Sequence, residues 1–126
     1  MAANFFKLPV YKKALDLERQ FTLSTQKAPR DVKYARLNAM HETVLQIIED
    51  IAFANEFSIH RVEYINKALG ELNGFVIRVR LLLDLRYISK KGFAAIVRAE
   101  EDVTRQLTGW RNSLEKISGN NINNNQ

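Results

Sequence analysis

Residues 62–83 read VEYINKALGELNGFVIRVRLLL, the most regular stretch of the chain. Apolar residues recur there at alternating steps of three and four, which places them on one face of an α-helix. They are Val62, Ile65, Leu69, Leu72, Val76, Val79 and Leu83. A helix with such a face has to bury it against other helices to be stable. The stretch therefore predicts a long helix inside a helical bundle.

Two glycines, Gly70 and Gly74, lie four residues apart within this helix. Each destabilises a helix interior by roughly 1 kcal/mol relative to alanine. Their spacing indicates either a place where another helix approaches closely or two glycines that the helix tolerates. Both interpretations stay open.

Three further segments have helical periodicity: Pro9 to Lys27, Pro29 to about Asn55, and Ser89 to Ile117. Pro29 separates the first two, because proline disfavours helical geometry in the residue before it. Ser58 and Ser89 are expected to cap the helices that follow them. The positions expected to be buried are Val10, Ala14, Leu17 and Phe21; Tyr34, Leu37, His41, Val44, Ile48, Ile51 and Asn55, flanked by Met40, Leu45, Ile47 and Ala54; and Phe93, Ile96, Val103, Leu107, Trp110, Leu114 and Ile117.

Four helices joined by short connections pack as antiparallel neighbours. The sequence therefore predicts an all-α fold, an antiparallel up-down-up-down four-helix bundle formed by residues 1–117. Residues 118–126, SGNNINNNQ, are polar and of low complexity. Such a composition has nothing to bury, so we expect a disordered or frayed tail.

The composition fits a single soluble domain. The chain has 126 residues, of which 46% are hydrophobic and 26% charged, close to the average for globular proteins. It has no cysteine, which excludes disulfides and thiolate chemistry and fits a cytoplasmic location. No export signal is visible, and no stretch approaches the ~20 apolar residues of a membrane span.

Residues suited to catalysis are few. His41 lies on a helical seam, where a histidine is more often a core or interface residue, and His60 lies in a turn. The acidic runs Glu49-Asp50 and Glu100-Glu101-Asp102 lack the Glu-x-x-His pairs of helical metal sites, so a solvated face is the better interpretation. No phosphate-binding loop or nucleophile motif occurs. We therefore expect no enzymatic activity, no metal and no cofactor.

Positive charge is concentrated in residues 78–111, which contain eight basic and four acidic side chains in a chain of net charge +5. Several basic residues recur at steps of six or seven, which predicts one stripe that could neutralise the phosphates of RNA or DNA without sequence specificity. A solvated face or an acidic protein partner explains the stripe equally well. The candidate nucleic-acid-binding residues are Arg78, Arg80, Arg86, Lys90, Lys91, Arg98, Arg105 and Arg111.

Apolar residues outside the predicted seams raise the question of self-association. They are Tyr11, Leu15, Phe53, Phe57, Phe75 and Leu82. Some of them face another subunit, or the bundle covers them with broad apolar stripes. The sequence favours neither interpretation.

Several short stretches resemble a known family. They are residues 8–14 (LPVYKKA), Pro29, Arg30 and Tyr34, residues 51–55 (IAFAN), residues 78–91 (RVRLLLDLRYISKK), and Gly109-Trp110. The chain resembles the four-helix-bundle group that includes proteins encoded by 23S ribosomal RNA intervening sequences and the accessory variability protein (Avd) of diversity-generating retroelements. Gly109-Trp110 and the even helix spacing are more similar to the retroelement branch.

That branch implies a homopentamer with a basic surface that binds nucleic acid and the retroelement reverse transcriptase. We therefore expect a non-enzymatic accessory protein. The alternative is an intervening-sequence-type bundle that acts as a structural or protein-interaction module without nucleic-acid binding. One departure is the acidic run Glu100-Glu101-Asp102, which interrupts the basic stripe.

Overall fold

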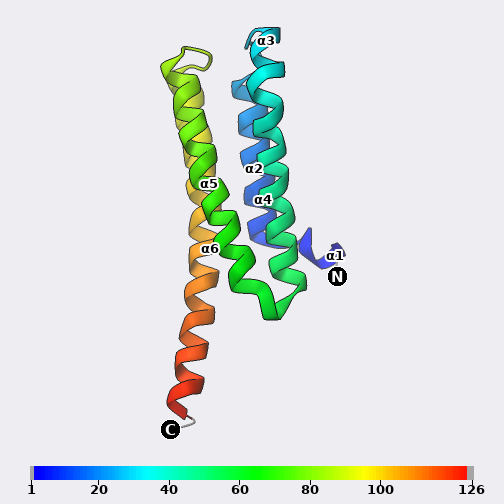
Figure 1. Ribbon diagram of the computed structural model, residues 1–126, viewed down its shortest axis with the longest axis vertical. Coiled ribbons are helices and arrows are strands. Elements are labelled where there is room, and N and C mark those ends of the chain that lie inside the picture. The colour runs from blue at the N-terminus through cyan, green and yellow to red at the C-terminus, as the bar shows by residue number, and fades with distance from the viewer. Residues whose placement is uncertain (1, 125–126) are drawn as a thin grey trace.

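Four long helices make up the fold, as the computed structural model in Figure 1 shows. They are α2 Pro9–Ser24, α4 Asn38–Glu56, α5 Arg61–Asp84 and α6 Lys90–Asn124. The structure describes the backbone of residues 2–124 and the side chains of residues 4–118, and no strand occurs within that backbone. Successive long helices run in opposite directions. The predicted all-α, up-down-up-down four-helix bundle is confirmed.

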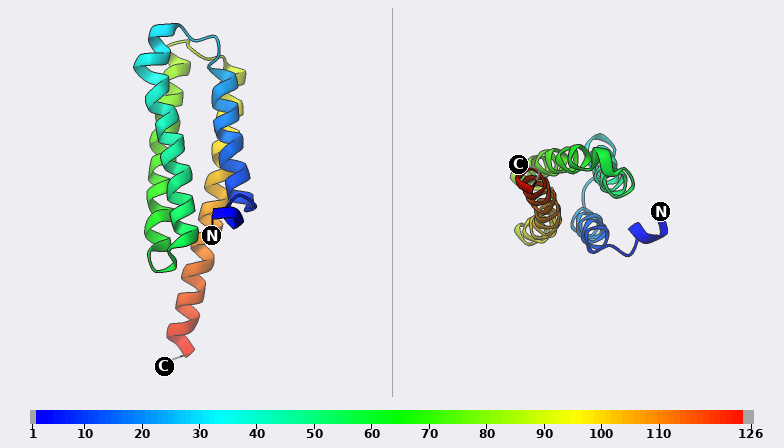
Figure 2. Two further views of the ribbon diagram at one scale, coloured as in Figure 1. Left: turned by 90° about the vertical axis from the view of Figure 1, so that its right-hand side faces the viewer. Right: turned by 90° about the horizontal axis from the view of Figure 1, so that it is seen from below.

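The helices form a ring in which α4 packs along α5 and α2 packs along α6 (Figure 2). A short helix, α1 Ala2–Phe5, lies beside α4 at the end where the chain begins. At the same end, α6 extends past the other helices (Figures 1 and 2). Ile117, predicted to be buried, is therefore 58% exposed, because no other helix reaches it.

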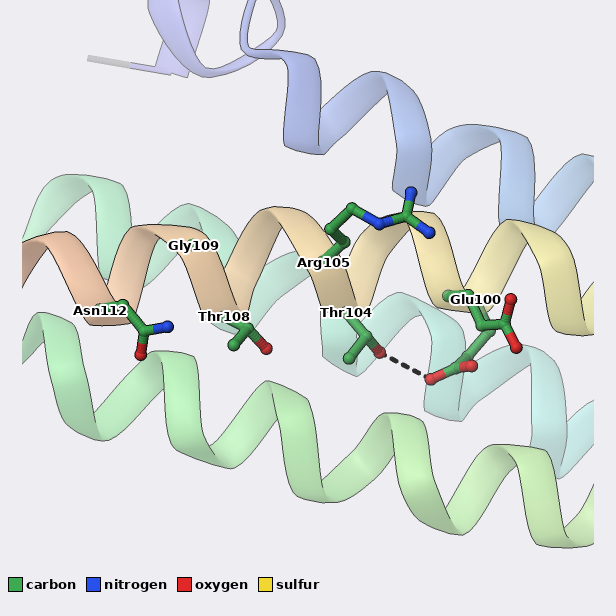
Figure 3. Close-up of a pocket in the computed structure, with 7 residues that line it drawn as sticks. Glu100, Thr104, Arg105, Thr108, Gly109 and Asn112 are labelled. Carbon is green, nitrogen blue, oxygen red and sulfur yellow. Dashed lines mark hydrogen bonds between the residues drawn. The ribbon is translucent and has the colours of Figure 1, made fainter.

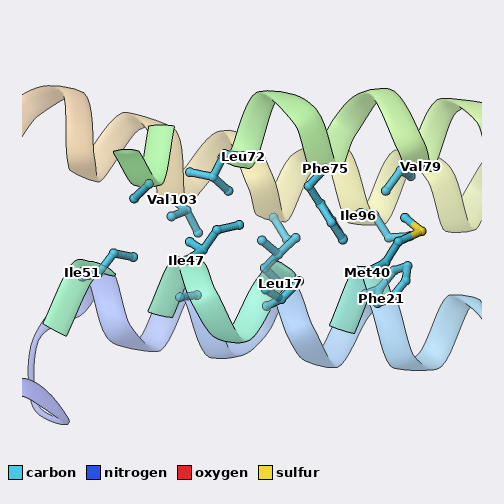
Figure 4. Packing of buried hydrophobic residues seen from close by; sticks show 14 of the residues in the cluster. Leu17, Phe21, Met40, Ile47, Ile51, Leu72, Phe75, Val79, Ile96 and Val103 are labelled. Atoms are coloured by element: carbon cyan, nitrogen blue, oxygen red, sulfur yellow. The ribbon is translucent and has the colours of Figure 1, made fainter. Parts of the chain in front are cut away.

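The hydrophobic core runs along the axis of the bundle, and side chains from all four long helices meet in it (Figure 4). The rings of Phe21 and Phe75 meet edge to face with their centroids 5.1 Å apart. Each fully buried aliphatic or aromatic side chain of this kind stabilises the fold by roughly 1.5–3 kcal/mol. The predicted seam of α2, formed by Val10, Ala14, Leu17 and Phe21, is buried throughout.

The buried face of α5 is rotated from its predicted position. Three of the predicted positions, Ile65, Leu72 and Val79, are buried, but Ala68, Phe75 and Leu82 complete the stripe. Each of these three lies one residue before a position that was predicted to be buried, namely Leu69, Val76 or Leu83. Phe75 has to be enclosed because its ring packs against Phe21. The predicted position Val62 is exposed, while Leu69, Val76 and Leu83 are half-buried.

Tyr34 was predicted to be buried, and that prediction is wrong. The helix that leads into α4 starts with α3, Arg30–Val32, and continues through one π turn, Lys33–Leu37. The buried side chains on either side of the turn, Val32 and Leu37, are five residues apart, a spacing that a π turn matches. Tyr34 lies between them and is 66% exposed. Leu45, another predicted flank, is exposed as well.

Of the two predicted serine caps, one forms. The Gly92 amide donates a 3.0 Å hydrogen bond to Ser89 Oγ at the start of α6. Ser58 instead opens a single 3-10 turn, Ser58–His60, and neither this turn nor α5 has a side-chain cap. The cap predicted at Ser58 is therefore wrong.

The predicted tail overlaps the end of α6. The backbone is helical as far as Asn124, past the predicted boundary at Ile117. Residues 125–126, and the side chains from residue 119 onward, lie outside the described residues. Among the described helices, none is both long and apolar enough to cross a membrane.

The glycine pair on α5 faces open space. A Cβ atom added at Gly70 or Gly74 would have no neighbouring atom within 4 Å. Within the described part of this chain, no helix uses these glycines for a close approach.

Candidate nucleic-acid interface

The eight basic residues predicted to form one stripe lie on different faces of the bundle. Arg78 on α5 donates a 3.1 Å hydrogen bond to Thr43 on α4. Arg111 on α6 donates to Asn66 on α5, at 2.9 Å. A step of six residues, such as that from Arg105 to Arg111, turns a helix by about 120° from its starting direction. Arg111 therefore points away from the line of Arg98 and Arg105.

Two of the predicted residues form ion pairs on their own helices. The Arg80 Nε atom lies 3.1 Å from Asp84 Oδ1, and the Arg105 Nη1 atom lies 3.0 Å from Asp102 Oδ1. Asp102 also lies 3.9 Å from the Lys13 ammonium group on α2. Such exposed pairs contribute little stability, but they reduce the charge available to a phosphate.

The acidic run on α6 borders a groove of about 510 Å³ (Figure 3). Glu100 was predicted to be solvated, which is wrong: it is buried and accepts a 2.6 Å hydrogen bond from the Thr104 hydroxyl. Burial raises the pKa of Glu100, and the negative charge of Glu101 raises it further. The hydrogen bond from Thr104 lowers the pKa and partly offsets this rise. Arg105 extends to the other side of the helix, toward α2 (Figure 3). This face of α6 therefore does not offer a continuous row of cations.

Positive charge instead gathers at one end of the bundle. The turn between α2 and α4 and the turn between α5 and α6 lie at the same end, the upper one in Figure 1. Residues 27–36 and 80–91, which we call the basic end, contain eight basic and two acidic side chains, a balance of +6 against +5 for the whole chain. The basic residues are Lys27, Arg30, Lys33, Arg36, Arg80, Arg86, Lys90 and Lys91.

A hollow of about 690 Å³ opens between the two turns. Lys27, Arg86 and Lys91 line it together with neutral residues, and no carboxylate belongs to its lining. The Ser24 hydroxyl lies 3.5 Å from the Gly92 carbonyl oxygen, a long hydrogen bond that joins the end of α2 to the start of α6. Within the described residues, none of the three cations lining the hollow forms an ion pair.

Arg86 has an unusual backbone conformation. Its φ angle is 65°, in the left-handed region. The Tyr87 amide donates to the Leu82 carbonyl at 2.8 Å, and the Arg86 amide donates to the Leu83 carbonyl at 2.9 Å. These two bonds define a Schellman motif, whose left-handed position is usually glycine. Arginine in that position keeps a cation at the rim of the hollow at the expense of backbone strain.

Half of the basic end was missed by the sequence reasoning. Residues 27–36 end 42 positions before the basic stretch that starts at residue 78, and only the fold brings the two turns to the same end of the bundle. A signal was present, because the first and third turns of an up-down-up-down bundle lie at the same end. Adding the charges of those two turns would have found it.

Each of the two histidines lies beside a carboxylate. The His41 Nδ1 atom lies 2.6 Å from Glu18 Oε1, and the His41 ring packs edge-on against Phe21 at 4.7 Å. This is the interface role that was expected. The His60 Nδ1 atom lies 3.3 Å from Glu63 on the surface. Within the described residues, no group of three or more histidine or acidic side chains is placed to hold a metal ion.

Asp50 is a buried carboxylate that was predicted to be solvated, and that prediction is wrong. Its side chain is fully buried, accepts a 3.1 Å hydrogen bond from Gln46 and lies 3.6 Å from the Lys67 ammonium group. Burial, followed by the hydrogen bond and charge of Asp50, raises the pKa of Glu71 to about 7, while Lys67 opposes the rise. One buried oxygen on each of these two carboxyl groups lacks a hydrogen-bond partner, and a proton held by Glu71 would provide a donor between them.

The apolar residues outside the predicted seams divide into two groups. Phe75 and Leu82 belong to the core and are not available to another subunit. Phe53 and Phe57 remain exposed and line an apolar hollow of about 440 Å³ beside α1. Leu15 is also exposed, and Tyr11 is half-buried.

Comparison of the chain with models of known protein families and with curated proteins gives no match. The family resemblance seen in the sequence therefore stays a prediction.

Proposed function

We propose that this protein is a non-enzymatic accessory protein that binds RNA or DNA without sequence specificity through the basic end. The observation that carries the proposal is the concentration of eight basic side chains around two turns that meet at one end of the bundle. Cations held together in this way neutralise neighbouring phosphates, and each contact releases counterions from the nucleic acid. The hollow between Lys27, Arg86 and Lys91 gives such a phosphate a place to enter.

The family resemblance also implies an assembly state and a protein partner. It implies that the protein assembles as a homopentamer and binds the reverse transcriptase of a diversity-generating retroelement, and the absence of cysteine fits a cytoplasmic location. The exposed Phe53 and Phe57 rings and the uncovered glycine face of α5 leave surface for such contacts. Light scattering at micromolar concentration tests the assembly, and the mass of a monomer would exclude the pentamer.

A salt series on two matched triple variants tests nucleic-acid binding. One variant replaces Lys27, Arg86 and Lys91 with glutamine, and the other replaces Arg98, Arg105 and Arg111. Each removes three positive charges, so general electrostatic attraction falls equally in both. We expect the first variant to lose more affinity for mixed-sequence RNA and DNA and to show a shallower dependence on salt.

A larger loss in the second variant would move the binding surface to α6, as the sequence alone predicted. No binding by the unmodified protein at low salt would remove the proposal. The second candidate function, a structural or protein-interaction module without nucleic-acid binding, would then stand. It is favoured by the carboxylate pairing of Arg80 and Arg105 and by the apolar hollow beside α1.

A further inference from the structure

An exposed aromatic ring belongs to the basic end. Tyr34 is 66% exposed and lies in the π turn Lys33–Leu37. The Arg30 guanidinium group lies 5.7 Å from the centroid of the Tyr34 ring, within the range of a cation–π contact. The π turn matches the five-residue spacing of the buried Val32 and Leu37 and holds Tyr34 outward between them. The fold therefore presents an exposed tyrosine ring beside the Arg30 guanidinium group, and the ring is not part of the core.

An exposed aromatic ring contacts single-stranded and duplex nucleic acid differently. A base in a duplex is stacked inside the helix and paired, so its face cannot reach a protein ring. In a single strand every base has a free face, and stacking on an aromatic side chain is largely independent of sequence. A compact group of cations around a hollow also suits a flexible strand better than a rigid duplex, which needs a longer row of contacts. The row on α6 is interrupted by Asp102, which pairs with Arg105 and lies near Lys13.

We propose that the basic end binds single-stranded nucleic acid in preference to duplex, with a base stacked on Tyr34 and a backbone phosphate in the hollow lined by Lys27, Arg86 and Lys91. The inference rests on the proposed function and narrows its ligand class. Tyr34 selects the unpaired strand, and the cations supply the affinity that depends on salt.

Fluorescence anisotropy tests this with a short labelled oligonucleotide of mixed sequence, as a single strand and as the matching duplex. The proteins are the unmodified chain, Tyr34→Ala, Tyr34→Phe and Ile77→Ala. Phenylalanine keeps the stacking ring, and Ile77 is an exposed apolar residue on α5, outside the basic end. We expect Tyr34→Ala to bind the single strand roughly 5- to 150-fold more weakly and to bind the duplex with unchanged affinity. Tyr34→Phe and Ile77→Ala should bind as the unmodified chain does.

The outcomes separate this inference from the proposed function. Equal affinity for the two forms, unchanged in Tyr34→Ala, overturns the preference for single strands. If the glutamine variant of Lys27, Arg86 and Lys91 still loses affinity in that case, the proposed function stands. No binding of either form at low salt overturns both. Because Tyr34 is outside the core, thermal unfolding of Tyr34→Ala should match that of the unmodified chain, which excludes misfolding as the cause of a loss.

Discussion

The left-handed backbone at Arg86 leads to a prediction with an unusual sign. A residue with a Cβ atom in the left-handed conformation is destabilised by roughly 1–2 kcal/mol, whereas glycine is not. Glycine loses more backbone entropy on folding, which offsets about 0.5–1 kcal/mol of that difference. We therefore expect the free energy of unfolding of Arg86→Gly to exceed that of Arg86→Ala by about 1 kcal/mol. That difference raises the unfolding midpoint by about 4 °C in a domain of this size.

Comparing glycine with alanine at this position isolates the strain, since both variants lose the same guanidinium group. Ala94, exposed within α6, provides the reference, because Ala94→Gly should destabilise the protein by about 1 kcal/mol. Urea unfolding followed by circular dichroism measures all four proteins, including the unmodified chain. If Arg86→Gly is less stable than Arg86→Ala, which is the order expected inside an ordinary helix, the backbone at position 86 is not strained.

The same two variants also report on binding. Both should bind nucleic acid more weakly than the unmodified chain, and to the same extent, because affinity depends on the charge and not on the backbone conformation. A variant that gains stability and loses binding would show that strain at Arg86 is kept for the cation it presents.

Three further predictions concern the core, the glycine face and the buried carboxyl pair. Phe75→Ala should lower the unfolding free energy by roughly 3–5 kcal/mol, whereas Phe57→Ala should change it far less, and similar losses in urea titrations of the two would contradict the core assignment. Gly70→Ala should raise the melting temperature, since its Cβ meets no atom and alanine favours helix by about 1 kcal/mol, and a lower melting temperature would indicate that something packs there. The Glu71 pKa is raised from 4.5 to about 7, so between these pH values the folded state binds more protons than the unfolded state. The stability that this group contributes is therefore complete below pH 4.5 and is lost as the pH rises through 7. Glu71→Gln should reduce that decline in denaturation midpoints measured from pH 5 to pH 8, and an unchanged decline would exclude a proton on Glu71 as its cause.

The sequence predicted the fold well because one strong pattern per helix was enough. Leu17 and Phe21 face the core as their spacing requires. The pattern failed where packing between helices decides the outcome. Phe75 is buried because it meets Phe21 on another helix, and Tyr34 is exposed because Val32 and Leu37 are both buried and a π turn separates them.

The candidate site was predicted only in part, because charge was counted along the chain and not in space. The turn from Arg86 to Lys91 was identified, but Lys27 and the other cations of the first turn were not. Asp50 was expected to be solvated because its partner Glu71 belongs to the next helix, a pairing that periodicity does not contain. The strain at Arg86 likewise depends on how α5 ends, which residue type alone does not reveal.

Amide hydrogen exchange with and without a saturating single-stranded oligonucleotide tests the central claim most directly. The account predicts that exchange slows in the two segments of the basic end, residues 27–36 and 80–91, and stays unchanged in residues 98–112 of α6. Slower exchange confined to α6, or no change anywhere, would contradict it.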